Sequence, residues 1–250
     1  MTAFVFHSLM PNNRMKSNLN LIRKRYERKF VPETLTVAQV KQIILSLPSF
    51  FRPLYHPRFV NNLYLDSLGF DYYYDNVHGR SERKKVRIRW YGDLLAESVE
   101  PVLEIKIKSA FVGDKKQYKL PKTRISEIIH SKTALSDYLK LAEADLPTDV
   151  INLLRRLRPT ILNRYYRYYF LDTSGKYRIT VDENVRYQSI HPNVNFTINP
   201  KQIDNYPVVE LKYDEKYDDD AMQITDQIPF RLTKNSKYII GIEAFYPVRY

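Results

Sequence analysis

Residues 83–91 read Arg-Lys-Lys-Val-Arg-Ile-Arg-Trp-Tyr, and this stretch decides how the rest of the chain is interpreted. Side chains along a β-strand alternate between two faces, so one face here is cationic and the other apolar. Arg83, Lys85, Arg87 and Arg89 share the first face, and Val86, Ile88 and Trp90 share the second. A column of like charges repels itself unless an anion opposes it. A polyphosphate would oppose it well, because arginine binds two phosphate oxygens at once. An isolated strand of this kind is more often the solvent side of a sheet, so the other strands must decide.

The composition of the 250 residues describes a globular chain that needs an anionic partner. Hydrophobic residues make up 44% and charged residues 27%, which is typical of a folded protein. The net charge is +12, which favours nucleic acid, a membrane surface or a phosphorylated small molecule as ligand. Glycine is scarce, at 6 residues, and neither a GxGxxG nor a GxxxxGK[ST] motif occurs. Side chains rather than a glycine-rich loop would therefore bind phosphate.

The periodicity of the chain predicts mostly strands, with two helical regions. The predicted strands are residues 21–31, 58–67, 83–91, 101–109, 160–172, 176–187 and 208–213. A helix is expected from about 36 to 47, and a helical insertion, broken near Pro147, from about 122 to 157. We expect residues 1–20 to be a flexible leader, residues 189–206 a loop or irregular edge, and 21–250 a single domain.

Four other strands repeat the division of 83–91 into a charged face and an apolar face. Acidic and basic residues alternate in phase on them, as in Glu27 with Lys29, Glu104 with Lys106, and Glu210 with Lys212. Either the charged faces point to water, or the apolar faces pack outward against helices and the charges line an interior. A closed antiparallel barrel removes strand edges, and a charged interior requires water or an anion. The second arrangement agrees better with the in-phase acids and the predicted helices.

The order of the motifs along the chain resembles a known family. The motifs are Tyr26–Phe30, Arg83–Gly92, Glu104-x-Lys106, Arg167 in a tyrosine-rich strand, Arg178-x-Thr180-x-Asp182, Glu210-x-Lys212 and Ser236–Tyr238. Together they resemble the VTC (vacuolar transporter chaperone) domain of the triphosphate tunnel metalloenzymes, the CYTH-like superfamily. The resemblance implies an α+β fold, an eight-stranded antiparallel β-barrel with helices packed outside, whose tunnel binds triphosphate. It also implies a polyphosphate polymerase that transfers the γ-phosphate of ATP to a growing chain with Mn²⁺ or Mg²⁺.

The resemblance implies roles for individual residues. The catalytic, phosphate-binding cations would be Lys29, Arg87, Arg89, Lys106, Arg167, Arg178 and Lys237, with Lys234 and Ser236 beside the phosphates. Glu210 would be the metal ligand, and Glu27, Glu104 and Asp182 are further candidate ligands. Arg83 and Lys85 are expected at the mouth of the tunnel.

One departure from the wider superfamily bears on the reaction. Many members begin with Glu-x-Glu-x-Lys, whereas this chain has Arg25-x-Glu27-x-Lys29. The change removes an acid and adds a cation, which favours a polymerase over a triphosphatase. A triphosphatase, a non-catalytic polyphosphate-binding module and a nucleic-acid-binding module remain alternatives. Nucleic acid is the least favoured ligand, because the in-phase carboxylates would repel it.

The remaining features concern location and partners. The chain contains no cysteine, which excludes disulfides and thiol metal sites. No apolar run approaches the length of a membrane helix, and the N-terminus lacks the pattern of a signal peptide. We therefore expect a soluble, cytoplasmic protein. Any association with a membrane would require a membrane-protein partner.

Overall fold

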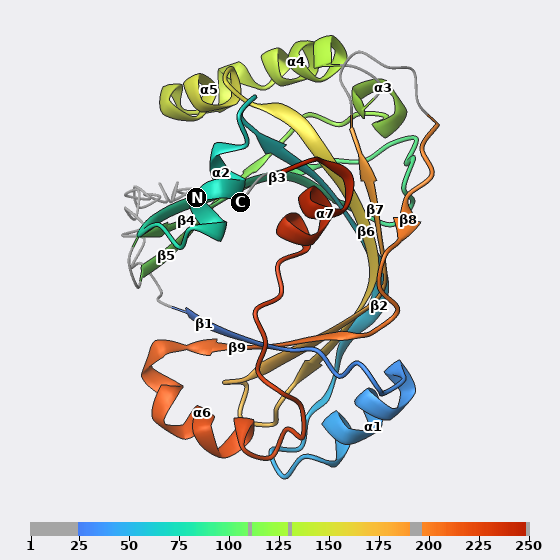
Figure 1. Cartoon of the computed structure of the whole chain (residues 1–250), viewed down its shortest axis with the longest axis vertical. Coiled ribbons are helices and arrows are strands. Elements are labelled where there is room, and N and C mark those ends of the chain that lie inside the picture. Colours follow the sequence, from blue (N-terminus) through green and yellow to red (C-terminus); the bar gives the residue numbers. More distant parts are fainter. Residues whose placement is uncertain (1–24, 110–111, 130–131, 191–196, 249–250) are drawn as a thin grey trace, which may run out of the picture.

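A computed structural model describes residues 25–109, 112–129, 132–190 and 197–248. Eight strands follow one another in a single curled sheet in the order β1-β9-β7-β6-β2-β3-β4-β5, and a short β8 pairs with β7 (Figure 1). All pairings are antiparallel. The strands are β1 Arg25–Phe30, β2 Arg52–Asp66, β3 Glu82–Tyr91, β4 Val102–Ser109, β5 Val112–Lys119, β6 Arg158–Leu171, β7 Arg178–Ser189, β8 Lys201–Gln202 and β9 Val208–Asp214. The predicted α+β fold around an eight-stranded antiparallel sheet is confirmed. The predicted leader, residues 1–20, lies outside the described residues.

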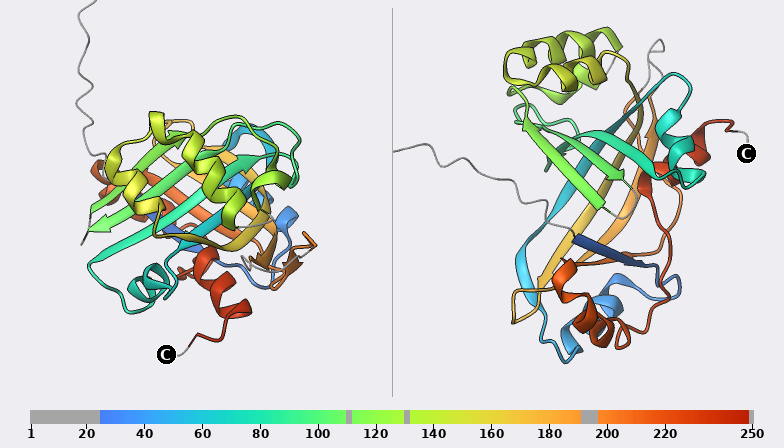
Figure 2. Two further views of the ribbon diagram at one scale, coloured as in Figure 1. Left: turned by 90° about the horizontal axis from the view of Figure 1, so that it is seen from above. Right: turned by 90° about the vertical axis from the view of Figure 1, so that its left-hand side faces the viewer.

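Helices cover the outside of the sheet at two places (Figures 1 and 2). Helix α1 starts after Thr36, whose side chain and that of Gln39 form a reciprocal capping box. Pro147 directly precedes α5 and separates it from α4, as the sequence predicted. The helices are α1 Val37–Ser46, α2 Asp71–Val77, α3 Ile125–Ile129, α4 Lys132–Leu141, α5 Thr148–Leu154, α6 Asp218–Thr225 and α7 Lys237–Phe245, with short 3₁₀ turns at Glu143–Asp145 and Glu215–Tyr217.

The apolar faces of the strands point outward, towards these helices. Val86, Ile88 and Trp90 of β3 are fully buried in a core that also contains residues of α3, α4 and α5. A second core joins α1 and α6 to β1, β7 and β9. Burial of each such aliphatic side chain contributes about 1.5–3 kcal/mol, so packing of the helices fixes the face on which the charges lie. The charged faces consequently line the concave side of the sheet.

Helix α7 packs against the concave side instead of the outside. It belongs to a third core, with residues of β2, β6 and β7. A Cβ added at Gly241 would lie 2.8 Å from the Ile161 side chain, so the absence of a side chain permits this close approach. The Tyr238 hydroxyl donates a hydrogen bond to the buried carboxylate of Asp66. Helix α7 therefore covers one end of the curled sheet.

Strands β1 and β5 are the two edge strands of the sheet, and side-chain contacts bridge the gap between these edges. Lys106 Nζ of β4 lies 2.6 Å from Glu27 Oε2 of β1. The segment that leads into α7 also joins β1, because the Thr233 amide donates to the Lys29 carbonyl at 2.8 Å. The sequence predicted a closed barrel. Within the described residues the sheet is strongly curled, but no backbone hydrogen bonds join β1 to β5.

Candidate active site

The concave side of the sheet holds a set of charged residues, which we call the interior cluster. Strands β1, β3, β4, β5, β6, β7 and β9 and the first residue of α7 each contribute to it. Among the described residues its cations outnumber its carboxylates, so the cluster carries a net positive charge. The cations are Lys29, Lys85, Arg87, Arg89, Lys106, Lys115, Arg167, Lys212 and Lys237, and the carboxylates are Glu27, Glu104, Asp182 and Glu210.

Glu104 is the counter-ion of the cations on β3. Arg87 Nη2 lies 2.5 Å from Glu104 Oε2, and Arg87 Nε donates to the same oxygen at 2.7 Å. Lys115 Nζ lies 2.7 Å from Oε1, and Arg89 Nη1 lies 3.6 Å from Oε2. Burial opposes ionisation of this carboxyl, but Arg87, Arg89 and Lys115 outweigh it and hold the pKa of Glu104 well below its usual range. Glu104 is therefore charged at neutral pH and orients the arginines.

Asp182 is the counter-ion of the cations on β6 and α7. Arg167 donates from Nε to Oδ1 at 2.5 Å and from Nη2 to Oδ2 at 2.8 Å, and Lys237 Nζ lies 2.5 Å from Oδ2. Burial disfavours the carboxylate, yet Arg167 and Lys237 lower the pKa of Asp182 to about 2. The fork of Arg167 is consequently fixed in one orientation.

Glu210 and Glu27 lie on neighbouring strands and share a lysine. Lys212 Nζ lies 3.1 Å from Glu210 Oε2 and 3.9 Å from Glu27 Oε1. Lys29 Nζ lies 3.8 Å from Glu210 Oε1 and donates to the Asn235 carbonyl at 2.7 Å. Burial opposes ionisation of Glu210, but Lys212 and Lys29 hold its pKa well below the usual range. Both carboxylates are thus available as anionic oxygen ligands.

These two glutamates fit a divalent cation better than the other acids do. Arginine forks already occupy Glu104 and Asp182, whereas within the described residues the ion pairs of Glu210 and Glu27 are all with lysines. No group of three or more potential ligands meets within the described part of the chain. Mg²⁺ and Mn²⁺ are commonly held by one or two carboxylates, with phosphate oxygens and water completing the shell. The residues present therefore fit a cation that binds together with a phosphorylated substrate.

Lys85 lies inside the cluster, and its expected position at the tunnel mouth is corrected. Its Nζ donates to the Ser236 hydroxyl at 3.0 Å, just before α7. Burial, together with the nearby charges of Lys29, Lys106 and Arg87, lowers its pKa to about 7. Lys85 is therefore only partly charged at neutral pH.

The structure gathers most, though not all, of the predicted site residues. It brings together Lys29, Arg87, Arg89, Lys106, Arg167, Lys237 and Ser236 with the four predicted carboxylates. Arg178 shares the face of Thr180 and Asp182 but is exposed at the start of β7. Lys234 is exposed, and the neighbouring Asn235 is buried in its place. Lys212 also lies in the cluster; the sequence placed it in phase with Glu210 but gave it no role. The sequence did not identify Lys115, Gln117, Asn62, Asn163 and Tyr165, all of which contact or adjoin the cluster.

Uncharged hydrogen-bond donors beside the arginines could still bond to a ligand. Arg89 Nε donates to Asn62 Oδ1 at 2.8 Å, and Asn62 Nδ2 donates to Asn163 Oδ1 at 2.8 Å. Within the described residues, Asn163 Nδ2 and the Thr180 hydroxyl are buried with no protein partner. Buried donors without a partner are rare in native proteins, so these atoms indicate a place for a polar ligand or water.

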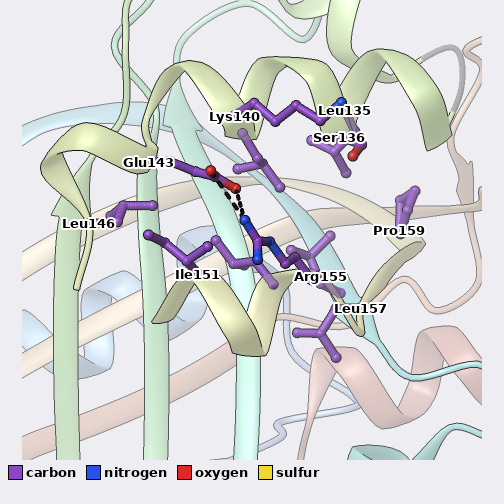
Figure 3. A pocket seen from close by; sticks show the side chains of 12 residues that line it. Leu135, Ser136, Lys140, Glu143, Leu146, Ile151, Arg155, Leu157 and Pro159 are labelled. Atoms are coloured by element: carbon purple, nitrogen blue, oxygen red, sulfur yellow. Dashed lines mark hydrogen bonds and ion pairs between the residues drawn. The ribbon is translucent and has the colours of Figure 1, made fainter. Parts of the chain in front are cut away.

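A separate cavity lies outside the barrel, between α4, α5 and the sheet (Figure 3). Its volume is about 190 Å³, and apolar side chains such as Leu135, Ile151 and Leu157 line it. Arg155 Nη2 pairs with Glu143 Oε1 at 3.2 Å across it. The wall is mostly apolar, and its two cations, Arg155 and Lys140, are each paired with a carboxylate. Such a wall does not suit a polyanion, so this cavity is not the phosphate site.

Comparisons with known proteins agree with this geometry. The VTC domain model matches residues 24–246. The chain belongs to the VTC domain family. This confirms the resemblance seen in the sequence motifs. Within the described residues, no helix has both the length and the apolar character needed to cross a membrane.

Solved structures resemble this chain at low sequence identity. An adenylate cyclase candidate from Vibrio parahaemolyticus aligns with a TM-score of 0.50 and 10% identity, covering 87% of this chain and 98% of its own. An adenylyl cyclase candidate from Hippeastrum, described as having a dominant triphosphatase activity, aligns with a TM-score of 0.47 and 16% identity, covering 90% and 98%. A comparison with curated proteins found no significant sequence match. At such identities the likeness concerns the fold alone.

Proposed function

We propose that this VTC domain is a polyphosphate polymerase that transfers the γ-phosphate of ATP to the end of a polyphosphate chain. The observation that carries the proposal is the convergence of Arg87, Arg89 and Arg167 on one buried surface, each oriented by a carboxylate or an amide. Preorganised arginine forks match the oxygens of consecutive phosphates. A cationic surface enclosed on the concave side of a sheet suits a narrow linear polyanion better than a folded nucleic acid.

The reaction needs positioning and charge stabilisation more than proton transfer. The terminal oxygen of the polyphosphate chain forms a bond to the γ-phosphorus, the bond from that phosphorus to the β–γ bridging oxygen breaks, and ADP leaves with the electron pair. The attacking oxygen is already anionic, so it needs no general base. Arg87, Arg89 and Arg167 hold the phosphates in line and oppose the charge that develops on the transferred group. Glu210 and Glu27 would hold a divalent cation, which when bound neutralises phosphate oxygens.

A triphosphatase is the second candidate, since water attacking the same phosphorus would release phosphate. The Arg25-x-Glu27-x-Lys29 sequence favours transfer to phosphate, because a cation replaces an acid at the first position of the motif. An extra cation would help to attract an anionic acceptor, for which water has no need. We further propose a cytoplasmic location and, if the domain works at a membrane, a membrane-protein partner.

The test of this function is an assay that measures two products at once. The full chain is incubated with ATP and either Mn²⁺ or Mg²⁺, and polyphosphate and free phosphate are both quantified. Chain growth in excess of phosphate release supports the polymerase. Phosphate release without chains shows a triphosphatase, and triphosphate binding with neither product shows a non-catalytic binding module.

Changing Glu210 to glutamine should weaken binding of the divalent cation. The neutral amide retains the shape of the side chain but removes the anionic ligand, so we expect the Mn²⁺ concentration for half-maximal activity to rise at least about tenfold. Binding of Mn²⁺ in the presence of tripolyphosphate, followed by electron paramagnetic resonance, should weaken in parallel. Glu127→Gln on α3 is the matched surface control. Unchanged Mn²⁺ binding by Glu210→Gln would refute the metal assignment.

Binding of triphosphate should take up protons through Lys85. Its pKa of about 7 in the free protein means that the amine is mostly neutral at pH 8, and a bound polyanion raises that pKa. The affinity should therefore fall as pH rises above 7, and binding at pH 8 should take up a large part of one proton. Calorimetry in buffers with different ionisation enthalpies measures this uptake. Lys85→Arg, charged throughout, should bind with much less uptake; equal uptake by both proteins would contradict the role of Lys85.

A further inference from the structure

Four residues form a group at the end of the curled sheet opposite α7. We call Tyr55, Arg58, Tyr91 and Tyr169 the tyrosine rim. Strands β3 and β6 both run antiparallel to β2, so they are parallel to each other and their C-terminal residues reach the same end. Arg58 of β2 lies between them.

The rim directly continues the phosphate-binding surface. Tyr91 shares a face of β3 with Arg89, and Tyr169 shares a face of β6 with Arg167, in each case two residues further along. Two residues of a strand span about 7 Å. The rim is therefore within reach of the group attached to a triphosphate that the arginines hold.

The geometry of the rim is that of a stacking surface. The Arg58 guanidinium carbon lies 4.0 Å from the centroid of the Tyr91 ring and 5.4 Å from that of Tyr169, and Arg58 Nε donates to the Tyr169 hydroxyl at 3.3 Å. The rings of Tyr55 and Tyr169 pack edge to face with centroids 5.6 Å apart. Tyr169 is buried, whereas Tyr91 is 40% and Tyr55 55% exposed. Two aromatic rings and a guanidinium thus remain accessible beside a polyanion site.

We propose that the tyrosine rim binds the nucleobase of a nucleoside triphosphate whose phosphates lie in the interior cluster. Every nucleobase has a π-face that stacks on tyrosine or arginine, and such stacking does not depend on the identity of the base. Helix α7 covers the other end of the sheet, so the nucleoside projects towards the rim. The proposal rests on the proposed function, which takes ATP as the donor, and adds the place where the base of that ATP binds. An inorganic chain would use Arg58 but gain nothing from the tyrosine rings.

The test compares ATP with inorganic tripolyphosphate as ligands of the full chain by calorimetry. Tyr91→Ala should weaken ATP binding about tenfold, the size of effect expected for one stacking partner, while the affinity for tripolyphosphate changes less than twofold. Tyr91→Phe keeps the ring and should bind ATP like the wild type. Tyr55→Ala should shift ATP binding in the same direction as Tyr91→Ala. The retained tripolyphosphate affinity shows in the same experiment that the variants are folded.

The matched control is Phe59→Ala, an exposed aromatic on β2 that pairs with Tyr166 away from the rim. It should alter neither affinity. Equal loss of ATP and tripolyphosphate affinity in Tyr91→Ala, or no loss of either, would overturn the nucleobase assignment but leave the phosphate site standing. Failure of the wild type to bind either ligand would instead overturn the proposed function itself.

Discussion

Replacing Arg89 with glutamine is expected to lower kcat/KM for ATP by roughly 10²–10³-fold. Arg89 is only 8% exposed, and its Nε is anchored on Asn62 at 2.8 Å, so the remaining guanidinium nitrogens are positioned for a ligand. Glutamine removes the charge and the fork. It also leaves Glu104 with one cation fewer, so the carboxylate repels phosphate more strongly. Steady-state kinetics of ATP consumption measures the effect.

Arg186→Gln provides the matched control for this substitution. Arg186 is an exposed strand arginine that pairs in register with Arg164 of β6, away from the interior cluster. The control removes the same charge from the protein, so it reports any effect of net charge alone. We expect it to change kcat/KM by less than about threefold, the effect of screened surface charge. Equal losses in the two variants would mean that Arg89 acts only through the overall field of the protein.

Replacing Asp182 with asparagine is expected to destabilise the fold by about 3–5 kcal/mol. Asp182 is 2% exposed and is the shared counter-ion of Arg167 and Lys237, so the substitution leaves two buried cations uncompensated. For a domain of this size the melting temperature should fall by roughly 6–20 °C. Because the folded-state pKa is lowered to about 2, the stabilisation by Asp182 is complete above its ordinary pKa and is lost as pH falls through about 2.

The same variant should be rescued by an anion. Tripolyphosphate supplies the charge that asparagine lacks, so adding it should raise the melting temperature of Asp182→Asn more than that of the wild type. Asp149→Asn is the control, since Asp149 is 69% exposed and lies 3.8 Å from Lys116 on the surface. It should shift the melting temperature by no more than a degree or two. A rescue equal to that of the wild type would show that Asp182 does not face the anion site.

The phase of the charged residues made most of the architecture predictable. On β3 the buried Val86, Ile88 and Trp90 alternate with Arg87 and Arg89, as the period of two requires. The same phase on β1, β4, β7 and β9 correctly placed the acids and bases on one concave surface. The in-phase acids and the predicted helices already favoured an interior over a solvent face for that surface. The buried contacts of the outer helices decide the choice.

Strand β5 and its contribution to the site were not predicted. Residues 112–119 read Val-Gly-Asp-Lys-Lys-Gln-Tyr-Lys and lack a clear apolar face, because β5 is at the end of the sheet. Lys115 and Gln117, which both bond Glu104 Oε1 at 2.7 Å, were consequently missed. Lys115 and Gln117 are two residues apart, as Glu104 and Lys106 are, and the two pairs lie opposite each other on the strands. This spacing was the feature of the sequence that could have indicated their role.

Contacts made by the C-terminal segment that leads into α7 were also not predictable from the sequence. Lys85 was expected at the mouth of the tunnel, but it bonds Ser236, a residue 151 positions away in the chain. The direction of this segment depends on how α7 packs between β2, β6 and β7. Lys234, expected beside the phosphates, is exposed for the same reason: the backbone entering α7 buries Asn235 and exposes Lys234.

The most direct test of the account is a crystal structure of the full chain with tripolyphosphate and Mn²⁺. We predict phosphate oxygens bonded to Arg87 and Arg89 of β3 and to Arg167 of β6, with the Mn²⁺ anomalous signal beside Glu210. Phosphates bound only on the outer surface, with an unaltered network of Arg87, Glu104, Arg167 and Asp182 inside, would contradict it.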